Sequence, residues 1–576
     1  MTMLHRRCFV ITDIVVRLTS ILLMLWTACC TARIALAGFQ ANNESSRIII
    51  DFEIDIHGIP NDDSYEIAIY NGKKLNETLH QERLRSGDTL MFPTNKTFYI
   101  MGGIVGYNLI NVTIIFDSQI VFTKHIKHWP RYEKEGKVLD CISFDNLTNV
   151  TFTSSYKRNN VKHYNGQFPT SLNGKDDSGG SGAHGGGLIH GNGDVWWGIP
   201  GIGYLVRGEN RPKLFVISNS RDIVFENLYL KDSPYWSFYA PNIQNLIIRY
   251  CQIDVRRDHN NVQHKHTLND LTSFNTDGFD ISGENVWIHN VAIWNQDDCI
   301  AVKGNSHNML FENITASGLG LTIGSINHDE KVKNITFRNI IMPQTIKGIY
   351  IKYGQHVNSK KASISNILYE NVTIIPQPTE QDGPTAIWIG PAQQSDDPYH
   401  PCASHPCSLC WRPPIIATDG SSSSEEEATA PVVAPSSDFN TLNKFQCNTP
   451  AAPIHNVTLR NISIIVHNNH IKNNNERKRN GIVGVIIGNA TMPIRDITFD
   501  NVNVNNDKNG KLVALPVGNS GHHYNYYCPN SGVMSGVATG TTNPVPNCFQ
   551  DFTTTTTRTT TTLTFHEVHD QILEAS

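Results

Sequence analysis

One short pattern recurs through much of the chain: a turn residue, an alternating apolar triplet, an Asn and a second β-like run. It is clearest in N-V-W-I-H-N-V-A-I from Asn285, N-M-L-F-E-N-I-T-A from Asn308 and N-I-T-F-R-N-I-I-M from Asn334. Self-similarity at a near-constant period is typical of solenoid proteins. Because the apolar residues alternate with a period of two, and no helical periodicity of useful length is present, the repeating unit is predicted to consist of strands. The sequence therefore predicts an all-β chain that coils as a single-stranded parallel β-helix.

The central residue of the pattern predicts how the coils stack. It is Asn in all aligned copies except one, and the copies are centred at positions 227, 250, 290, 313, 339, 371, 461 and 501. The intervals are 23, 40, 23, 26, 32, 90 and 40 residues, so the longer ones imply loop insertions or an extra coil. Asn tolerates the left-handed αL conformation of a tight bend, and stacked Asn amides can hydrogen-bond from coil to coil. We therefore expect Asn313, Asn371 and Asn461, although each lies in an N-x-S/T sequon, to be inward-pointing ladder residues.

The composition and the N-terminus indicate an exported globular protein. Hydrophobic residues are 39% and charged residues 17% of the chain, and the formal net charge of −5 gives no electrostatic indication of nucleic acid or of an anionic membrane. Residues 1–37 have the pattern of a signal peptide: arginines, an apolar run at 18–30, and A-L-A before Gly38. That run is shorter than the ~20 residues needed to span a bilayer, and an uncleaved signal anchor is the alternative.

The cysteines favour disulfides in such a setting, with at least one thiol left over. Cys402, Cys407 and Cys410 together with Cys447 could instead hold zinc, but their spacing matches no zinc module and export argues for disulfides.

These patterns divide the chain into six segments. They are a signal peptide or signal anchor at 1–37, an N-terminal β-rich cap at 38–100, a parallel β-helix with the candidate site at 101–375, an insertion with the Cys cluster and a disordered Ser/Glu/Pro stretch at 376–455, C-terminal β-helix coils and cap at 456–548, and a Thr-rich low-complexity tail at 549–576.

Three carboxylates are predicted to meet on neighbouring coils. Asp277, in N-T-D-G-F-D, precedes Asp297 and Asp298, in N-Q-D-D-C-I-A-V-K, by 20 and 21 residues, which is close to one coil. Residues one coil apart lie about 4.8 Å apart on adjacent strands, and clustered carboxylates are what acid–base hydrolysis of a sugar linkage requires. Since consecutive strand residues face opposite ways, Asp297 and Asp298 share a face only if the strand bulges or ends there. Otherwise one of them caps a turn or pairs with Lys303.

The following coils extend this group into a predicted solvent-exposed stripe. One coil further on lies G-L-G-L-T-I-G-S (318–325), and the next carries Y-I-K (350–352). Glycines such as Gly320 would leave room for a ligand to lie against the backbone.

In this order and spacing, the motifs resemble glycoside hydrolase family 28, the polygalacturonase family. G-N-G-D-V-W-W from Gly191 and D-S-P-Y-W-S from Asp232 also match its pattern. The likeness covers roughly residues 100–375 and is most specific at 275–303. It implies a right-handed parallel β-helix and an inverting hydrolase that cleaves α-1,4-galacturonosyl linkages in pectin.

The resemblance also implies roles for individual residues. Asp297 would be the general acid that protonates the departing glycosidic oxygen, while Asp277 and Asp298 would activate the attacking water. Crowding of the three acids would raise the pKa of one of them and keep it protonated. Asn275 would help to order the site, and Lys352 would pair with a substrate carboxylate.

Two residues depart from the family pattern. The glycine step usually reads G-H-G, with a His that supports the acids, but Leu319 stands at that position here. The x-I-K motif usually begins with an Arg that recognises the uronate, but Tyr350 begins it here. Tyr350 would instead stack on a neutral sugar face, which points toward rhamnogalacturonan, a substituted pectin or another acidic glycan.

Two other functions remain open. A pectate-lyase-like β-helix would need a calcium site and an arginine base, and residues 275–303 contain no Arg. A non-catalytic glycan-binding β-helix could have kept the acids and lost turnover. For the hydrolase we expect a secreted, cell-wall monomer with a pectic polysaccharide as its partner. No metal, cofactor or nucleic acid is expected, and no stable membrane partner unless the N-terminus is an uncleaved anchor.

Overall fold

The computed structural model describes residues 47–549 except for a set of internal gaps. The gaps are residues 81, 133–135, 158–186, 199–209, 256–272, 355–356, 377–385, 393–450, 468–480, 490, 509–510, 515–523 and 529–534. The chain divides into two compact units, residues 1–49 and 50–576, and nearly all described residues belong to the second.

The described residues are mostly in strands, with an α-helix, α2 (Tyr65–Thr78), and two short 3-10 helices, η1 (Ile126–His128) and η2 (Gly193–Val195). The strands of the first coils are β1 (Ile49–Asp51), β2 (Thr89–Phe92), β3 (Thr97–Ile100), β4 (Ile104–Tyr107), β5 (Ile110–Phe116), β6 (Gln119–Phe122), β7 (Ile142–Asp145), β8 (Thr148–Thr153), β9 (Leu188–His190), β10 (Phe215–Ser218), β11 (Ser220–Glu226), β12 (Tyr229–Lys231), β13 (Phe238–Arg249) and β14 (Gln252–Asp254). The later strands are β15 (Phe279–Trp294), β16 (Asp298–Val302), β17 (Ser306–Ser317), β18 (Gly320–Ile326), β19 (Lys331–Thr345), β20 (Ile349–Tyr353), β21 (Ser363–Pro376), β22 (Ile387–Pro391), β23 (Ile454–His467), β24 (Gly481–Ile486), β25 (Arg495–Lys508), β26 (Lys511–Ala514), β27 (Tyr524–Tyr527) and β28 (Gly536–Thr539).

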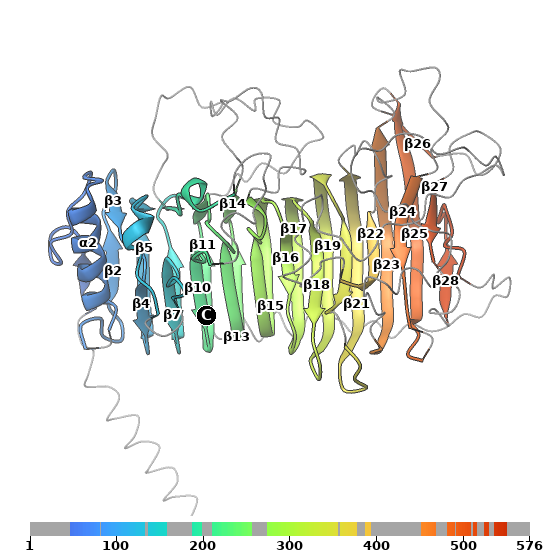
Figure 1. The fold of residues 1–576 in the computed structure, drawn as a ribbon, viewed down its shortest axis with the longest axis horizontal. Coiled ribbons are helices and arrows are strands. Elements are labelled where there is room, and N and C mark those ends of the chain that lie inside the picture. Colours follow the sequence, from blue (N-terminus) through green and yellow to red (C-terminus); the bar gives the residue numbers. More distant parts are fainter. Residues whose placement is uncertain are drawn as a thin grey trace, which may run out of the picture. The chain divides into compact units, whose positions relative to one another are not determined.

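Most strands pair in parallel with the equivalent strand one coil earlier and one coil later (Figure 1). One row of pairings runs β13–β15–β17–β19–β21–β23–β25, and another runs β16–β18–β20–β22–β24–β27. Alternating apolar side chains point into the coil and form a continuous core, in which the rings of Phe311, Phe337 and Tyr369 stack 4.6 and 4.7 Å apart. The predicted fold class, a right-handed parallel β-helix, is confirmed.

Both turn positions of the repeated pattern adopt the αL conformation. The first residues of the copies, such as Asn285 and Asn308, have φ values of 57° and 56°, and central residues such as Asn290 and Asn339 have φ values of 54° and 56°. Tyr250, the central residue that is not Asn, has a φ of 54°. The prediction that Asn marks the bends between strands is therefore confirmed.

The long sequence intervals are insertions within single coils. β21 and β23 pair directly in register, so that Asn366 and Asn456, 90 residues apart, are lateral neighbours joined by a hydrogen bond of 2.7 Å. The 40-residue intervals behave in the same way, because β13 pairs with β15 and β23 pairs with β25. The alternative of an extra coil is therefore excluded.

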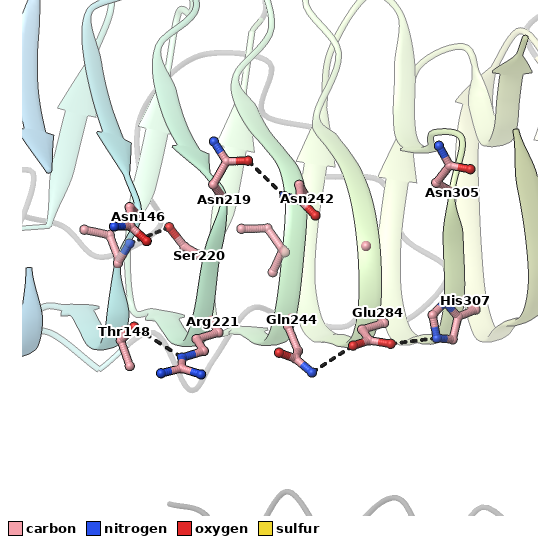
Figure 2. Close-up of a pocket in the computed structure, with 13 residues that line it drawn as sticks. Asn146, Thr148, Asn219, Ser220, Arg221, Asn242, Gln244, Glu284, Asn305 and His307 are labelled. Atoms are coloured by element: carbon pink, nitrogen blue, oxygen red, sulfur yellow. Dashed lines mark hydrogen bonds and ion pairs between the residues drawn. The ribbon is translucent and has the colours of Figure 1, made fainter. Parts of the chain in front are cut away.

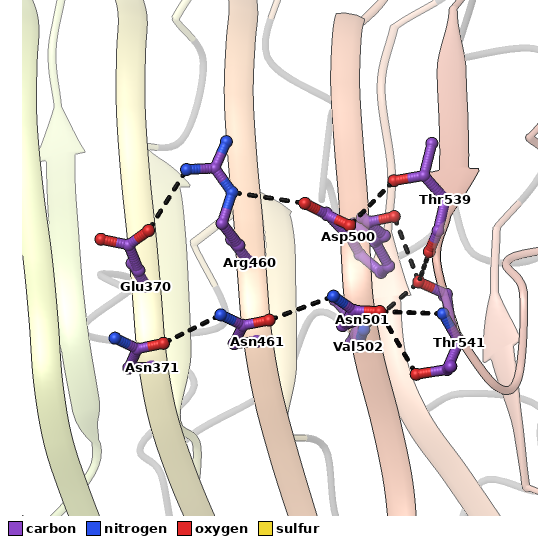
Figure 3. Close-up of polar contacts among 11 residues, drawn as sticks. Glu370, Asn371, Arg460, Asn461, Asp500, Asn501, Val502, Thr539 and Thr541 are labelled. Atoms are coloured by element: carbon purple, nitrogen blue, oxygen red, sulfur yellow. Dashed lines mark hydrogen bonds and ion pairs between the residues drawn. The ribbon is translucent and has the colours of Figure 1, made fainter. Parts of the chain in front are cut away.

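Asn side chains join neighbouring coils into ladders along the turns (Figure 3). Asn371 donates from Nδ2 to Oδ1 of Asn339 at 3.0 Å, Asn461 donates to Asn371 at 3.0 Å, and Asn501 donates to Asn461 at 3.1 Å. Asn371 and Asn461 are exposed, so the expectation that they point inward was wrong. The αL bend directs these amides along the outside of the coil, while the apolar residues on either side occupy the interior.

Two elements were not predicted from the sequence. Helix α2 lies in the β-rich cap, and its buried positions have helical spacing but are mostly small or polar: Ala68, Asn71, Gly72, Leu75 and Thr78. The Asn71 side chain is satisfied by Ile59 and Tyr99 backbone groups at 2.8 to 3.0 Å, so burial does not require an apolar residue there. Strand β22 lies within the segment that was assigned to the insertion at 376–455.

Cysteine pairing is described in part. Cys528 and Cys548 form a disulfide, whereas Cys141, Cys251 and Cys299 are buried free thiols. The signal peptide, the Cys402–Cys447 cluster with its zinc alternative, and the Thr-rich tail lie outside the described residues. Among the residues that are described, no helix is both long and apolar enough to cross a membrane.

Candidate active site

The register of successive strands produces one row of outward-facing residues. Across the pairings from β13 to β22 the lateral neighbours in this row are Tyr239, Asp280, Ala301, Thr322, Tyr350 and Trp388. The residues beside them in sequence, such as Ile300, Leu321 and Ile349, belong to the core inside the coil. The row therefore lies on the outer face of the sheet, opposite the core.

Asp277, Asp297 and Asp298 meet beside this row. One carboxylate oxygen of each lies within 4.8 Å of one from each of the other two. The coils approach closely here because Gly278 has no side chain: a Cβ atom at Gly278 would lie 2.2 Å from the backbone oxygen of Cys299. The predicted winding of one coil between Asp277 and Asp297 is what brings the acids together.

A strand boundary lets Asp297 and Asp298 approach the same group. β16 begins at Asp298, and its register with β18 shifts between Asp298 and Ile300. The sequence predicted a bulge or a strand end here if the two residues share a face, and the structure has a strand boundary with a register shift directly after it.

The two adjacent carboxylates have different partners. Asp297 accepts hydrogen bonds from the backbone N–H groups of Asp298, at 2.7 Å, and Asn275, at 3.2 Å. Asp298 accepts from the Thr322 hydroxyl at 2.5 Å and from Lys352 Nζ at 3.0 Å. Lys352, expected to pair with the substrate, is thus already ion-paired with Asp298.

A second lysine lies on the Asp277 side of the group. Lys303 Nζ is 3.0 Å from a carboxylate oxygen of Asp280 and 3.9 Å from one of Asp277. It also lies 5.2 Å from the centroid of the Trp236 ring. The alternative in which Lys303 pairs with Asp297 or Asp298 does not occur, because its partners are Asp277 and Asp280.

The carboxylates are buried, and the expectation of a solvent-exposed stripe was wrong. Asp277, Asp297 and Asp298 are 4%, 2% and 1% exposed, and Lys352 is 3% exposed. None of them belongs to the apolar core inside the coil. Polar and aromatic side chains of neighbouring coils pack over the outer face of the sheet, which sequence alternation alone does not reveal.

Burial changes the protonation of the acids. Burial, followed by repulsion from Asp298, raises the pKa of Asp297 to about 7, although Lys352 opposes the shift. Burial, with the Asp280 and Asp297 carboxylates, also raises the pKa of Asp277 well above its ordinary value. Burial alone would lower the pKa of Lys352, but Asp298 reverses this and raises it above the ordinary lysine value.

The two departures from the family pattern lie in one apolar cluster outside the coil. Leu319, Tyr350 and Trp388 pack together with Val485 and Ile487. The Tyr350 ring is fully buried and meets the Trp388 ring edge-on at 6.4 Å, so it offers no free face for a sugar to stack on.

The space beside Gly320 is also filled. A Cβ atom at Gly320 would lie 3.2 and 3.3 Å from the backbone oxygens of Gly348 and Lys347. The glycine therefore makes room for the next coil, rather than for a ligand.

A polar pocket of about 490 Å³ lies elsewhere on the turns, lined by none of the predicted site residues (Figure 2). Its ionisable groups are largely paired: Glu284 contacts His307 at 2.7 Å and accepts from Gln244 at 2.8 Å, while Arg221 donates to Thr148 at 3.3 Å. The pocket holds no group of acids that could catalyse hydrolysis, so the candidate site is the Asp277–Asp297–Asp298 group.

Four residues of the site were missed: Asp280, Thr322, Lys347 and Trp388. Asp280 lay inside the quoted N-T-D-G-F-D motif, and its position in the outward row follows from the coil period. Trp388 is the lateral neighbour of Tyr350, but the sequence before it contains no sign of where this coil begins.

The three acids are also close enough to one another to hold a cation, although Asp298 and Asp277 already have lysine neighbours.

Known proteins resemble this chain in sequence and in fold. The model of glycosyl hydrolases family 28 matches residues 131–376. A probable rhamnogalacturonase E from Aspergillus niger is 32% identical over 183 residues, which are 30% of this chain and 35% of that protein. A probable endopolygalacturonase C from Aspergillus aculeatus is 30% identical over 193 residues, 32% of this chain and 46% of that protein. The chain thus spans less than half the length of these relatives.

A solved structure supports the fold. Endo-xylogalacturonan hydrolase from Aspergillus tubingensis superposes with a TM-score of 0.51 at 15% identity, covering 85% of this chain and 99% of that chain. In sequence, residues 131–376 of this chain are therefore similar to glycosyl hydrolases family 28, and the coiled parallel sheet agrees with that similarity.

Proposed function

We propose that the protein is a glycoside hydrolase acting on pectin, with Asp297 as its general acid. The observation that carries this proposal is the contrast between two adjacent carboxyl groups. Burial raises the pKa of Asp297 to about 7, whereas Asp298 is held by the Lys352 ammonium and the Thr322 hydroxyl. Two neighbouring carboxyl groups with different partners are suited to acid–base hydrolysis of a glycosidic bond.

In this mechanism, Asp297 gives its proton to the departing glycosidic oxygen, while Asp298 and Asp277 accept a proton from the attacking water. The backbone N–H of Asn275 keeps Asp297 oriented. Because the acids are at most 4% exposed, substrate reaches them only when part of their cover moves aside.

The proposed linkage is α-1,4-galacturonosyl, with rhamnogalacturonan or another acidic glycan as the alternative. The names of the two matched Aspergillus relatives support both choices. Export to a cell wall is part of the proposal, and the Cys528–Cys548 disulfide supports it.

The test is release of reducing ends from polygalacturonate, rhamnogalacturonan and methyl-esterified pectin. We expect the wild-type protein to cleave at least one, and Asp297→Asn to lose more than about 99% of the activity while keeping its fold. Full turnover by Asp297→Asn would show that another group is the acid. Products that are unsaturated and absorb in the ultraviolet would identify a lyase, and binding without cleavage would identify a glycan-binding protein.

A further inference from the structure

Lys347 is a buried amine without an acidic partner in the part of the chain that the structure describes. It is 2% exposed, and its only charged or aromatic contacts there are with rings. Its Nζ lies 5.0 Å from the centroid of Tyr350 and 5.6 Å from that of Trp388. Two aromatic faces offset part of the cost of burying an ammonium group, but they supply no counter-charge.

Lys347 also lies close to the acids. Lys352, which is ion-paired with Asp298, has its Nζ 4.3 Å from the centroid of the same Tyr350 ring. The backbone N–H of Lys347 donates to Leu319, whose own N–H donates to the backbone oxygen of Asp297. Lys352 is therefore occupied by the protein, whereas Lys347 has no ion pair with an acidic side chain among the described residues.

We propose that Lys347 binds a carboxylate of the substrate next to the general acid, so that this position takes a uronate rather than a neutral sugar. The inference rests on the proposed function and deepens it by naming the sugar class. The inference also explains why Tyr350 can replace the arginine of the family pattern. The positive charge comes instead from Lys347, three residues earlier on the same coil.

The inference predicts a characteristic pH dependence. Burial, followed by repulsion from Lys352, lowers the pKa of Lys347 to about 7, and Asp298 and Asp297 oppose this shift. The charged groups that act on Lys347 are Lys352, Asp297 and Asp298, and the rings of Tyr350 and Trp388 lie against its Nζ. Since only the protonated amine attracts a carboxylate, the affinity for a uronate should fall as the pH rises through about 7.

The test compares Lys347→Met and Lys347→Arg with the wild-type enzyme. On polygalacturonate at pH 5.5, a value chosen as about 1.5 units below the Lys347 pKa, we expect Lys347→Met to raise KM about 10- to 100-fold and to change kcat less than about threefold. Lys347→Arg should keep KM within about threefold of the wild-type value and extend tight binding above pH 7, because a guanidinium stays charged. On fully methyl-esterified pectin, which lacks the negative charge, Lys347→Met should leave KM unchanged.

An unchanged KM for Lys347→Met on polygalacturonate would overturn the inference, as would an equal rise on the methyl ester. Thermal unfolding checks the fold: removing a buried unpaired charge should leave the melting temperature unchanged or raise it. Calorimetric binding of trigalacturonate to Asp297→Asn, with and without Lys347→Met, separates this inference from the proposed function. A loss of binding in the double variant supports the role of Lys347 even if no pectic polymer is cleaved, and equal binding contradicts it.

Discussion

At the scale of single residues, the surroundings of Asp297 and Asp298 matter more than their chemical identity. The two side chains are adjacent in sequence, yet backbone N–H groups contact one, and a lysine and a threonine contact the other. The sequence predicted that the acids would meet, because the coil period is visible in it. The sequence could not predict that the acids are buried or that Lys352 forms an ion pair with Asp298, because both depend on side chains that pack from other coils.

The pKa of Asp297 predicts the alkaline limit of activity. A general acid must be protonated, so kcat/KM should fall about tenfold per pH unit above pH 7. The profile should be measured with Lys347→Arg, because this variant removes the titration of the neighbouring lysine. Activity that stays constant to pH 9 would contradict the assignment of Asp297.

The stereochemistry of the product tests the proposed mechanism. The acids have oxygens within 4.8 Å of one another, closer than the ~6.5–9.5 Å typical of inverting sites with two carboxyl groups. We expect inversion because two carboxylates, Asp277 and Asp298, are proposed to activate water. Proton NMR of the first-formed product gives the anomeric configuration, and retention would identify one acid as a nucleophile.

The Lys352–Asp298 pair is expected to be important for stability. Lys352→Met would leave Asp298 buried without its counter-charge, which costs about 3–5 kcal/mol in comparable sites. The matched control is Lys361→Met, because Lys361 contacts Asp329 at 3.8 Å with both side chains mostly exposed. The control should cost less than about 1 kcal/mol in urea unfolding. Equal losses for the two variants would show that the buried pair has no special role.

At the scale of the elements, the strands and their bends were predictable because both have local causes. Alternating apolar residues specify a strand, and Asn at the bend specifies αL backbone, as the φ values of Asn285 and Asn290 show. Helix α2 was not predictable in this way. Its buried face relies on Asn71, whose hydrogen bonds to Ile59 and Tyr99 exist only in the folded chain.

Substitutions at Asn371 separate its two roles, the αL bend and the amide ladder. Asn371→Gly keeps the bend, with φ near its present 54°, but removes the side-chain bonds to Asn339 and Asn461. We expect it to cost about 1 kcal/mol. Asn371→Ala loses the bonds and also strains the bend, which adds about 1–2 kcal/mol. If urea unfolding gives the same loss for both variants, the αL conformation contributes nothing measurable here.

At the scale of the whole molecule, each coil contacts mainly the coils on either side, so stability is transmitted from neighbour to neighbour. This explains why an interval of 90 residues between Asn366 and Asn456 does not interrupt the β-helix. Strands on either side of an insertion can pair as long as the Asn bends of the two coils lie side by side again after the insertion. Those bends were predictable from the sequence, whereas the strand β22 that completes the coil was not.

The disulfide near the C-terminal end of the β-helix tests this nearest-neighbour organisation. Cys528 follows β27, which pairs with β24, and the bond to Cys548 closes a separation of 20 residues. Replacing both cysteines by Ser should destabilise these last coils by about 3 kcal/mol, through the freedom regained by the unfolded chain. Because several coils separate them from Asp297, the kcat at 25 °C should stay within about twofold of the wild-type value, while hydrogen exchange rises in β27 and β28. A matching rise of exchange at β16, or a large loss of kcat, would mean that the β-helix unfolds as one unit and that the active site depends on its far end.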